Sequence, residues 1–162
     1  MRMKLLKYLC SVFLCLNLIG CQNSSTIEST APFDIHFFYS ETCHYCEDLK
    51  SNLIPKIKEE FENQVTIYEH EIDDEESKKL YDEYLGVYDE QNDSVIPGKL
   101  KGVTTDFVDG ERYVPVLIIG DYYGFMGYDS NFDDDYIEDI HLARQNKDLS
   151  PKMAEGRWLF ND

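Results

Sequence analysis

Two cysteines separated by two residues, Cys43 and Cys46, lie shortly after an apolar and aromatic run at residues 33–39. This run is of strand type; it breaks at residues 40–42, Ser-Glu-Thr, and a segment of helical type begins at the first cysteine. On the first turn of a helix, such spacing brings two sulfur atoms within reach of a disulfide. A helix N-terminus also offers free N–H groups and a positive dipole end, which favour the thiolate. The pattern therefore predicts one thiol that attacks and one that resolves.

A structural disulfide and half of a zinc site are two other uses of this spacing. The bridge would close a very small loop, so it would restrain the unfolded chain little. A zinc site needs four ligands, and His36, His70 and His141 have no spacing that completes one. The two cysteines are also the only ones after residue 21, whereas a small exported domain held together by disulfides would need more. A redox pair is therefore the favoured interpretation.

The N-terminus has the pattern of an export signal. Residues 1–7 are basic, and residues 8–20 are apolar but too short to span a bilayer comfortably as a permanent helix. Residues 18–21, Leu-Ile-Gly-Cys, resemble the bacterial lipobox, in which the cysteine is lipidated and becomes the new N-terminus. We expect residues 1–20 to be a lipoprotein signal peptide and Cys21 to carry the lipid. The alternative is an uncleaved N-terminal anchor, and both place the domain outside the cytoplasm, tied to a membrane.

Length and charge limit the organisation of the chain after the signal. Residues 21–31 are polar, rich in Ser and Thr and without periodicity, so they are predicted to form a lipidated tether. The 162-residue chain leaves room for one ordinary domain, which we place at residues 32–162. The formal net charge of −17 repels nucleic acid and anionic membrane faces, so no nucleic-acid partner is expected.

The predicted elements alternate after the strand at residues 33–39. An apolar residue at every fourth position predicts a helix over residues 43–63, with a kink at Pro55. A second strand is expected at residues 65–72, and a second helix runs from residue 73 to about residue 88, with acids in its first turn. The inner faces of the two helices are expected to contain Leu49, Leu53, Ile57, Phe61, Leu80, Tyr84 and Val87.

The second half of the chain is less regular. Residues 89–113 contain turn signals, and residues 99–108 between these signals are expected to form a short helix or an irregular arm. Residues 114–120 predict a strong strand with a proline near its start, where proline is tolerated. Residues 121–128 predict a turn and the returning strand of a hairpin, and Ser130 or Asn131 is expected to cap a last helix. Trp158, Leu159 and Phe160 near the C-terminus are expected to pack back on the domain.

This order of elements resembles the thioredoxin fold over roughly residues 33–145. The residues that carry the resemblance are Thr-Cys-His-Tyr-Cys at 42–46 and Val-Pro-Val at 114–116, before a glycine-containing hairpin. The resemblance implies an α/β domain whose central mixed sheet is flanked by helices, with an insertion before the strand that begins with a cis-proline. Residues 89–113 would supply that insertion.

The resemblance also implies roles for individual residues. Cys43 would be the exposed nucleophile, and Cys46 would resolve the mixed disulfide. Pro115 would be cis and lie beside the sulfurs, while the backbone of Val114 would pair with the substrate. We also place His44 at the substrate-binding surface, where its imidazolium would stabilise the thiolate and make the disulfide more oxidising, although nearby acids oppose this. No metal or organic cofactor is implied.

One departure from the family concerns proton transfer. Thioredoxins keep a buried acid six residues before the first cysteine, where this chain has Phe37. Protons would then reach Cys46 through water or another group, which weakens the interpretation as a reductase. The predicted function is an extracytoplasmic, membrane-anchored thiol–disulfide oxidoreductase that exchanges disulfides with exported proteins and with a membrane redox partner. The alternatives are a thioredoxin-fold lipoprotein that binds copper or zinc and a non-catalytic surface binding protein.

Replacing Cys21 by serine tests the predicted anchor. Because a serine cannot accept the lipid, the variant should be released from the membrane or stay as an unprocessed precursor. Membrane fractionation and the intact mass of the product measure this, with Cys15→Ser in the apolar segment as the control. Unchanged membrane retention with normal signal cleavage would sink the lipidation hypothesis.

Overall fold

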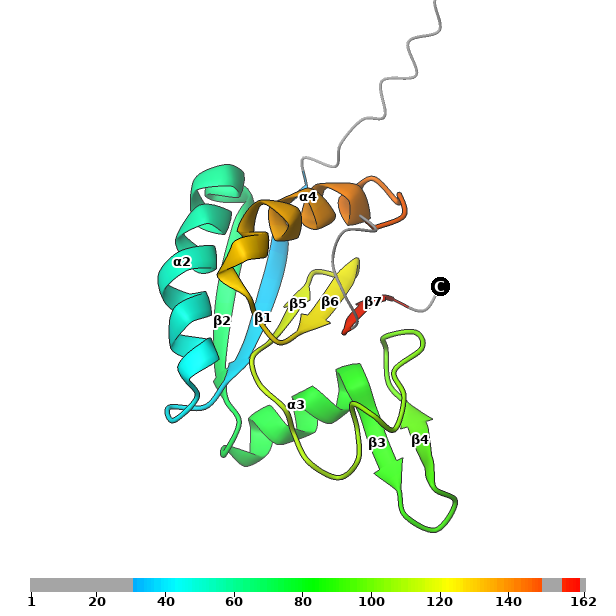
Figure 1. Cartoon of the computed structure of the whole chain (residues 1–162). Helices are drawn as coiled ribbons and strands as arrows, with labels where there is room; N and C mark the ends of the chain where they lie inside the picture. The colour runs from blue at the N-terminus through cyan, green and yellow to red at the C-terminus, as the bar shows by residue number, and fades with distance from the viewer. Residues whose placement is uncertain (1–30, 150–155, 161–162) are drawn as a thin grey trace, which may run out of the picture.

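The structure is a computed structural model and describes residues 31–149 and 156–160. The predicted signal peptide and the lipidation residue Cys21 lie outside the described residues, so both stay predictions. Figure 1 shows a mixed β-sheet with helices on both of its faces and a small hairpin beside it. The described chain is thus of the α/β class.

The sheet has five strands in the order β2-β1-β5-β6-β7. Strand β1 (Phe33–Tyr39) runs parallel to β2 (Val65–Glu71) and antiparallel to β5 (Val116–Ile119). Strands β6 (Tyr123–Met126) and β7 (Arg157–Leu159) continue the sheet in antiparallel fashion. Because β1 is paired on both sides and covered on both faces, its run of apolar residues matches the pattern of a central strand.

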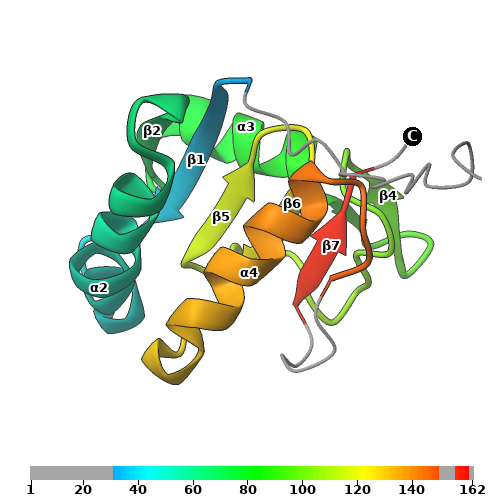
Figure 2. The same ribbon diagram turned by 90° about the horizontal axis from the view of Figure 1, so that it is seen from above.

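Helices cover both faces of the sheet. Helices α2 (His44–Phe61) and α4 (Asp133–Arg144) lie on one face, and α3 (Glu75–Leu85) lies on the other, as the view from above shows (Figure 2). A short 3-10 helix, η1 (Glu62–Gln64), directly follows α2, and a second one, η2 (Ser130–Phe132), directly precedes α4. Each face of the sheet therefore has its own hydrophobic core.

The predicted inner face of α2 is confirmed. Its four apolar positions are buried against β1 and α4, and complete burial of each such side chain contributes about 1.5–3 kcal/mol. Pro55 lies inside the helix, and the kink expected there stays a prediction. The buried residues of this stripe are Leu49, Leu53, Ile57 and Phe61.

The prediction that the second helix reaches about residue 88 is wrong. Gly86 ends α3 with φ +99°, and a Cβ at this position would lie 2.4 Å from the carbonyl oxygen of Ile96. The chain then enters β3 (Gly86–Asp89), which pairs with β4 (Ser94–Pro97). Val87 is consequently 45% exposed on this hairpin instead of buried on the helix. The buried residues of α3 are Ser77, Tyr81, Tyr84 and Leu85.

Other expectations for the second half are partly confirmed. Between Lys99 and β5 the chain forms the irregular arm rather than a short helix. The cap expected at Ser130 or Asn131 is wrong, because Asp129 caps η2 and α4 begins without a side-chain cap. Trp158 and Phe160 pack back on the domain as expected, whereas Leu159 is 37% exposed.

Two histidines share a hydrogen bond on neighbouring strands. His36 Nδ1 on β1 lies 2.8 Å from His70 Nε2 on β2, so one ring donates a proton and the other accepts it. Burial lowers the pKa of both rings, and the charge of His36 lowers that of His70 further. Asp34 and Asp74 act in the opposite direction, while Lys99 also lowers the pKa of His36.

This pair predicts a loss of stability in mild acid. Because the folded rings bind protons less readily than unfolded histidine, with its pKa of 6.5, stability is greatest above that pH and falls as the pH drops below it. We expect a lower urea midpoint at pH 5.5 than at pH 7.5, and a smaller difference in His70→Gln. His44→Gln is the control, because the ring of His44 is exposed. An equal difference in wild type and His70→Gln would contradict the prediction.

Candidate active site

The turn between β1 and α2 fixes the first cysteine. The Cys43 N–H donates to the Ser40 carbonyl oxygen at 3.1 Å, and the hydroxyl groups of Ser40 and Thr42 lie 3.1 Å apart. Cys43 occupies the N-cap position of α2, and its Sγ accepts the Cys46 N–H at 3.2 Å. The sulfur thus lies where backbone N–H groups and the helix dipole favour a negative charge.

The two cysteines form a disulfide and differ in accessibility. Their Cα atoms are 5.2 Å apart, which lies in the ordinary range for a disulfide. Cys43 is half-buried, whereas Cys46 is 3% exposed and packs in the core beneath α2. An attacking thiolate therefore reaches Cys43 more easily than Cys46.

A distant segment of the chain meets this disulfide. The Val114 carbonyl oxygen lies 3.6 Å from Cys43 Sγ, and the Val114–Pro115 peptide bond is cis. The Pro115 carbonyl oxygen accepts the Gly127 N–H at 2.8 Å, which connects the segment to the β5–β6 hairpin. The structure therefore brings together the two cysteines and the Val-Pro pair that the sequence singled out.

A cleft of about 530 Å³ adjoins this contact. Val114 and Pro115 belong both to its wall and to the segment that meets the disulfide. Of the two residues between the cysteines, Tyr45 lines the cleft and is 62% exposed. Other parts of the wall are formed by Asp48, Tyr128 and Asp129. The sequence analysis did not predict that these residues line a binding surface. Only Tyr45 could have been found from the sequence, because it lies between the two cysteines.

His44, the first residue of α2, is largely exposed. Its side chain is 79% exposed, and its Nε2 lies 3.4 Å from the Asp48 carboxylate, one turn further along α2. Its role in substrate binding stays a prediction.

No buried acid lies at the position that thioredoxins use for proton transfer, because Phe37 there is buried in the core with Cys46. In the described part of the chain, the buried acids are Asp133 and Asp139. Asp133 accepts a hydrogen bond from the Tyr128 hydroxyl at 2.6 Å, and burial together with this bond raises the pKa of Tyr128. The cleft wall thus presents a neutral phenol at this point.

Comparisons with known proteins do not assign the chain, since no protein family matches it and a search of curated proteins returns no relative. Among residues 31–149 and 156–160, no group of three or more His, Cys, Asp or Glu side chains could hold a metal ion. The alternative of a copper or zinc site stays a prediction. Within the same residues, no helix is long and apolar enough to cross a membrane.

The difference in burial predicts the order of alkylation. After reduction, a limiting amount of iodoacetamide should modify Cys43 before Cys46, because the second sulfur is covered by the core. Peptide mapping by mass spectrometry measures the two sites separately. Cys46→Ser should react at Cys43 about as fast as the wild type, whereas Cys43→Ser should react slowly at Cys46. Faster modification of Cys46 would reverse the assignment.

Proposed function

We propose that this protein is a membrane-anchored, extracytoplasmic thiol–disulfide oxidoreductase with a thioredoxin-like fold. The observation that carries the proposal is the Cys43–Cys46 disulfide at the start of α2, with its outer sulfur next to the Val114 carbonyl and an open cleft. The mixed sheet, flanked by helices, is compatible with that fold. In this interpretation, residues 89–113 form the insertion, and Pro115 directly precedes strand β5.

The proposed reaction is a pair of thiolate exchanges. When a substrate is oxidised, its first thiolate attacks Cys43 Sγ, the Cys43–Cys46 bond breaks, and Cys46 leaves as a thiolate that takes up a proton. The second substrate thiolate then attacks the substrate sulfur of the mixed disulfide, and Cys43 leaves as a thiolate. The substrate loses two electrons, which the two cysteines hold in reduced form. The same steps in reverse reduce a substrate disulfide.

The local structure supports Cys43 as the attacking and leaving sulfur. In the reduced protein, the Cys46 N–H that now lies 3.2 Å from Cys43 Sγ would donate to the thiolate. The helix dipole adds about 0.3–1 kcal/mol for a charge at this end. Because Phe37 supplies no proton relay, proton exchange at Cys46 would use water or another group.

The proposed substrates and location rest on the site together with the sequence. The backbone of Val114, at the cleft wall, is available to pair with an extended substrate segment beside its cysteine. The lipobox pattern at residues 18–21 supports a membrane anchor, so exported proteins are the proposed substrates. A membrane redox partner would return the cysteine pair to its starting state.

A trapping variant tests the proposal. Cys46→Ser leaves Cys43 without its resolving partner, so mixed disulfides with substrates should accumulate in cells. They should appear on non-reducing gels and disappear with dithiothreitol, whereas the Cys43→Ser/Cys46→Ser control should trap nothing.

A direct assay complements the trap. Purified wild type should exchange with the disulfides of insulin or with the thiols of a reduced, unfolded protein, and neither single cysteine variant should complete a turnover. Tight copper(I) binding by the reduced wild type, with no exchange in either direction, would instead favour the metal-binding alternative.

A further inference from the structure

The residue that meets Cys43 is held from both sides. Downstream of Val114, the chain enters β5, where Val116 pairs with Phe38 of β1. Upstream, the Tyr113 carbonyl oxygen accepts a hydrogen bond from the Tyr81 hydroxyl of α3 at 3.0 Å. Tyr81 is 1% exposed, so its hydroxyl is fixed by the packing around the ring. Helix α3 thus contacts the peptide unit directly before Val114.

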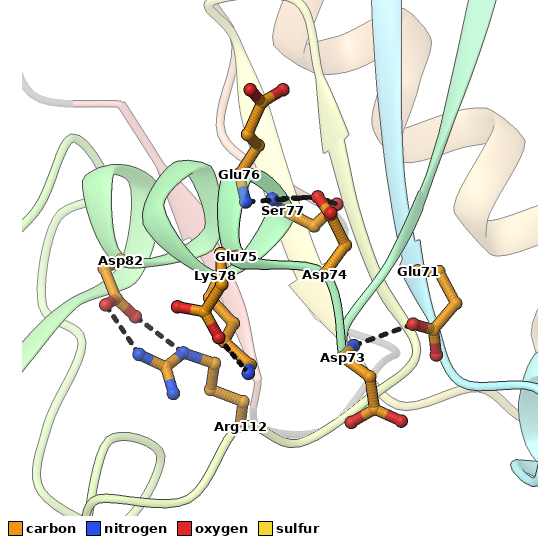
Figure 3. A network of polar contacts seen from close by, with 9 residues as sticks. All are labelled: Glu71, Asp73, Asp74, Glu75, Glu76, Ser77, Lys78, Asp82 and Arg112. Atoms are coloured by element: carbon orange, nitrogen blue, oxygen red, sulfur yellow. Dashed lines mark hydrogen bonds and ion pairs between the residues drawn. The ribbon is translucent and has the colours of Figure 1, made fainter.

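A second contact from α3 fixes the next residue upstream. Arg112 donates through Nε and Nη2 to the two carboxylate oxygens of Asp82, at 2.9 and 2.7 Å (Figure 3). A pair of parallel hydrogen bonds of this kind sets orientation as well as distance. Because Asp82 follows Tyr81 directly on α3, two consecutive residues of the helix hold two consecutive residues of the arm.

The start of α3 is in turn tied to the strand that leads to the cysteines. The Ile72 N–H donates to the carbonyl oxygen of Tyr39, the last residue of β1, at 2.8 Å. Two residues later, Asp74 caps α3 by accepting the N–H groups of Glu76 and Ser77 (Figure 3). The helix that holds Tyr113 is therefore fixed to the end of the strand that precedes Cys43.

We propose that Tyr81, Asp82 and Arg112 are positioning residues of the disulfide-exchange site. Through them, α3 sets the place of the Val114 carbonyl relative to Cys43 Sγ, and with it the backbone edge to which a substrate segment pairs. This inference rests on the proposed function. The three residues touch neither sulfur, so they act through the Tyr113–Val114 peptide unit.

The inference predicts a specific kinetic change. Removing the Tyr81 hydroxyl or the Asp82–Arg112 pair frees the Val114 backbone, while the bond from the Cys46 N–H to Cys43 Sγ stays in place. The KM for a protein disulfide should rise about 2- to 10-fold, the range that the loss of one hydrogen bond corresponds to. The kcat and the rate at which iodoacetamide modifies Cys43 should stay within about twofold of the wild type.

The test compares Tyr81→Phe with Tyr84→Phe in the insulin assay. Tyr84 is buried on the same helix but packs against His36 and Phe160, so its hydroxyl is the matched control. Asp82→Asn and Arg112→Gln change partly exposed side chains and provide variants that fold even if Tyr81→Phe does not. The exchanged pair Asp82→Arg/Arg112→Asp should restore KM toward the wild-type value.

The outcomes separate the inference from the function on which it rests. A raised KM in Tyr81→Phe and Asp82→Asn, with Tyr84→Phe unchanged and the exchanged pair rescued, supports the inference. Wild-type KM in folded Asp82→Asn and Arg112→Gln, or an equal rise in Tyr84→Phe, overturns it while the oxidoreductase function stands. A wild type that exchanges no disulfides overturns the proposed function itself.

Discussion

The antiparallel pairing of β1 with β5 is the contact on which the candidate site depends. Its register places Phe38 opposite Val116, so the end of β1 that leads to Cys43 lies beside the start of β5, where Val114 and Pro115 enter. All four residues of β5 are buried. A slip by one residue would exchange the faces of the strand and move the Val114 carbonyl away from the sulfur.

The two helical layers contribute differently to the site. Helix α2 supplies the cysteines and the N-terminal N–H groups, and its inner face anchors it on one side of the sheet. Helix α3, on the opposite side, reaches the same site through Tyr81 and the arm before β5. Helix α2 thus holds the disulfide, and helix α3 holds the backbone next to Val114, beside the disulfide.

The sequence was sufficient to predict the parts of this arrangement that have local signals. The strand before Cys43, the four-residue stripe of α2 and the Val-Pro strand all show in periodicity and composition. The end of α3 has no such local signal. Glycine is required at position 86 because the backbone there approaches the Ile96 carbonyl closely, and this contact exists only once the hairpin has formed. The Tyr81–Tyr113 bond joins residues 32 positions apart, and neither residue differs locally from other tyrosines of the chain.

The acids at the cleft have a consequence for the speed of encounter. Asp48 and Asp129 line the cleft beside the half-buried sulfur, on a chain whose formal net charge is −17. An approaching thiolate is itself an anion, so the field of the protein slows small anionic thiols, and added salt relieves this by screening. A protein with cationic residues around its cysteine experiences the opposite: attraction at low ionic strength that weakens as salt is added. A change in ionic strength would therefore alter the encounter rates of these two kinds of thiol in opposite directions.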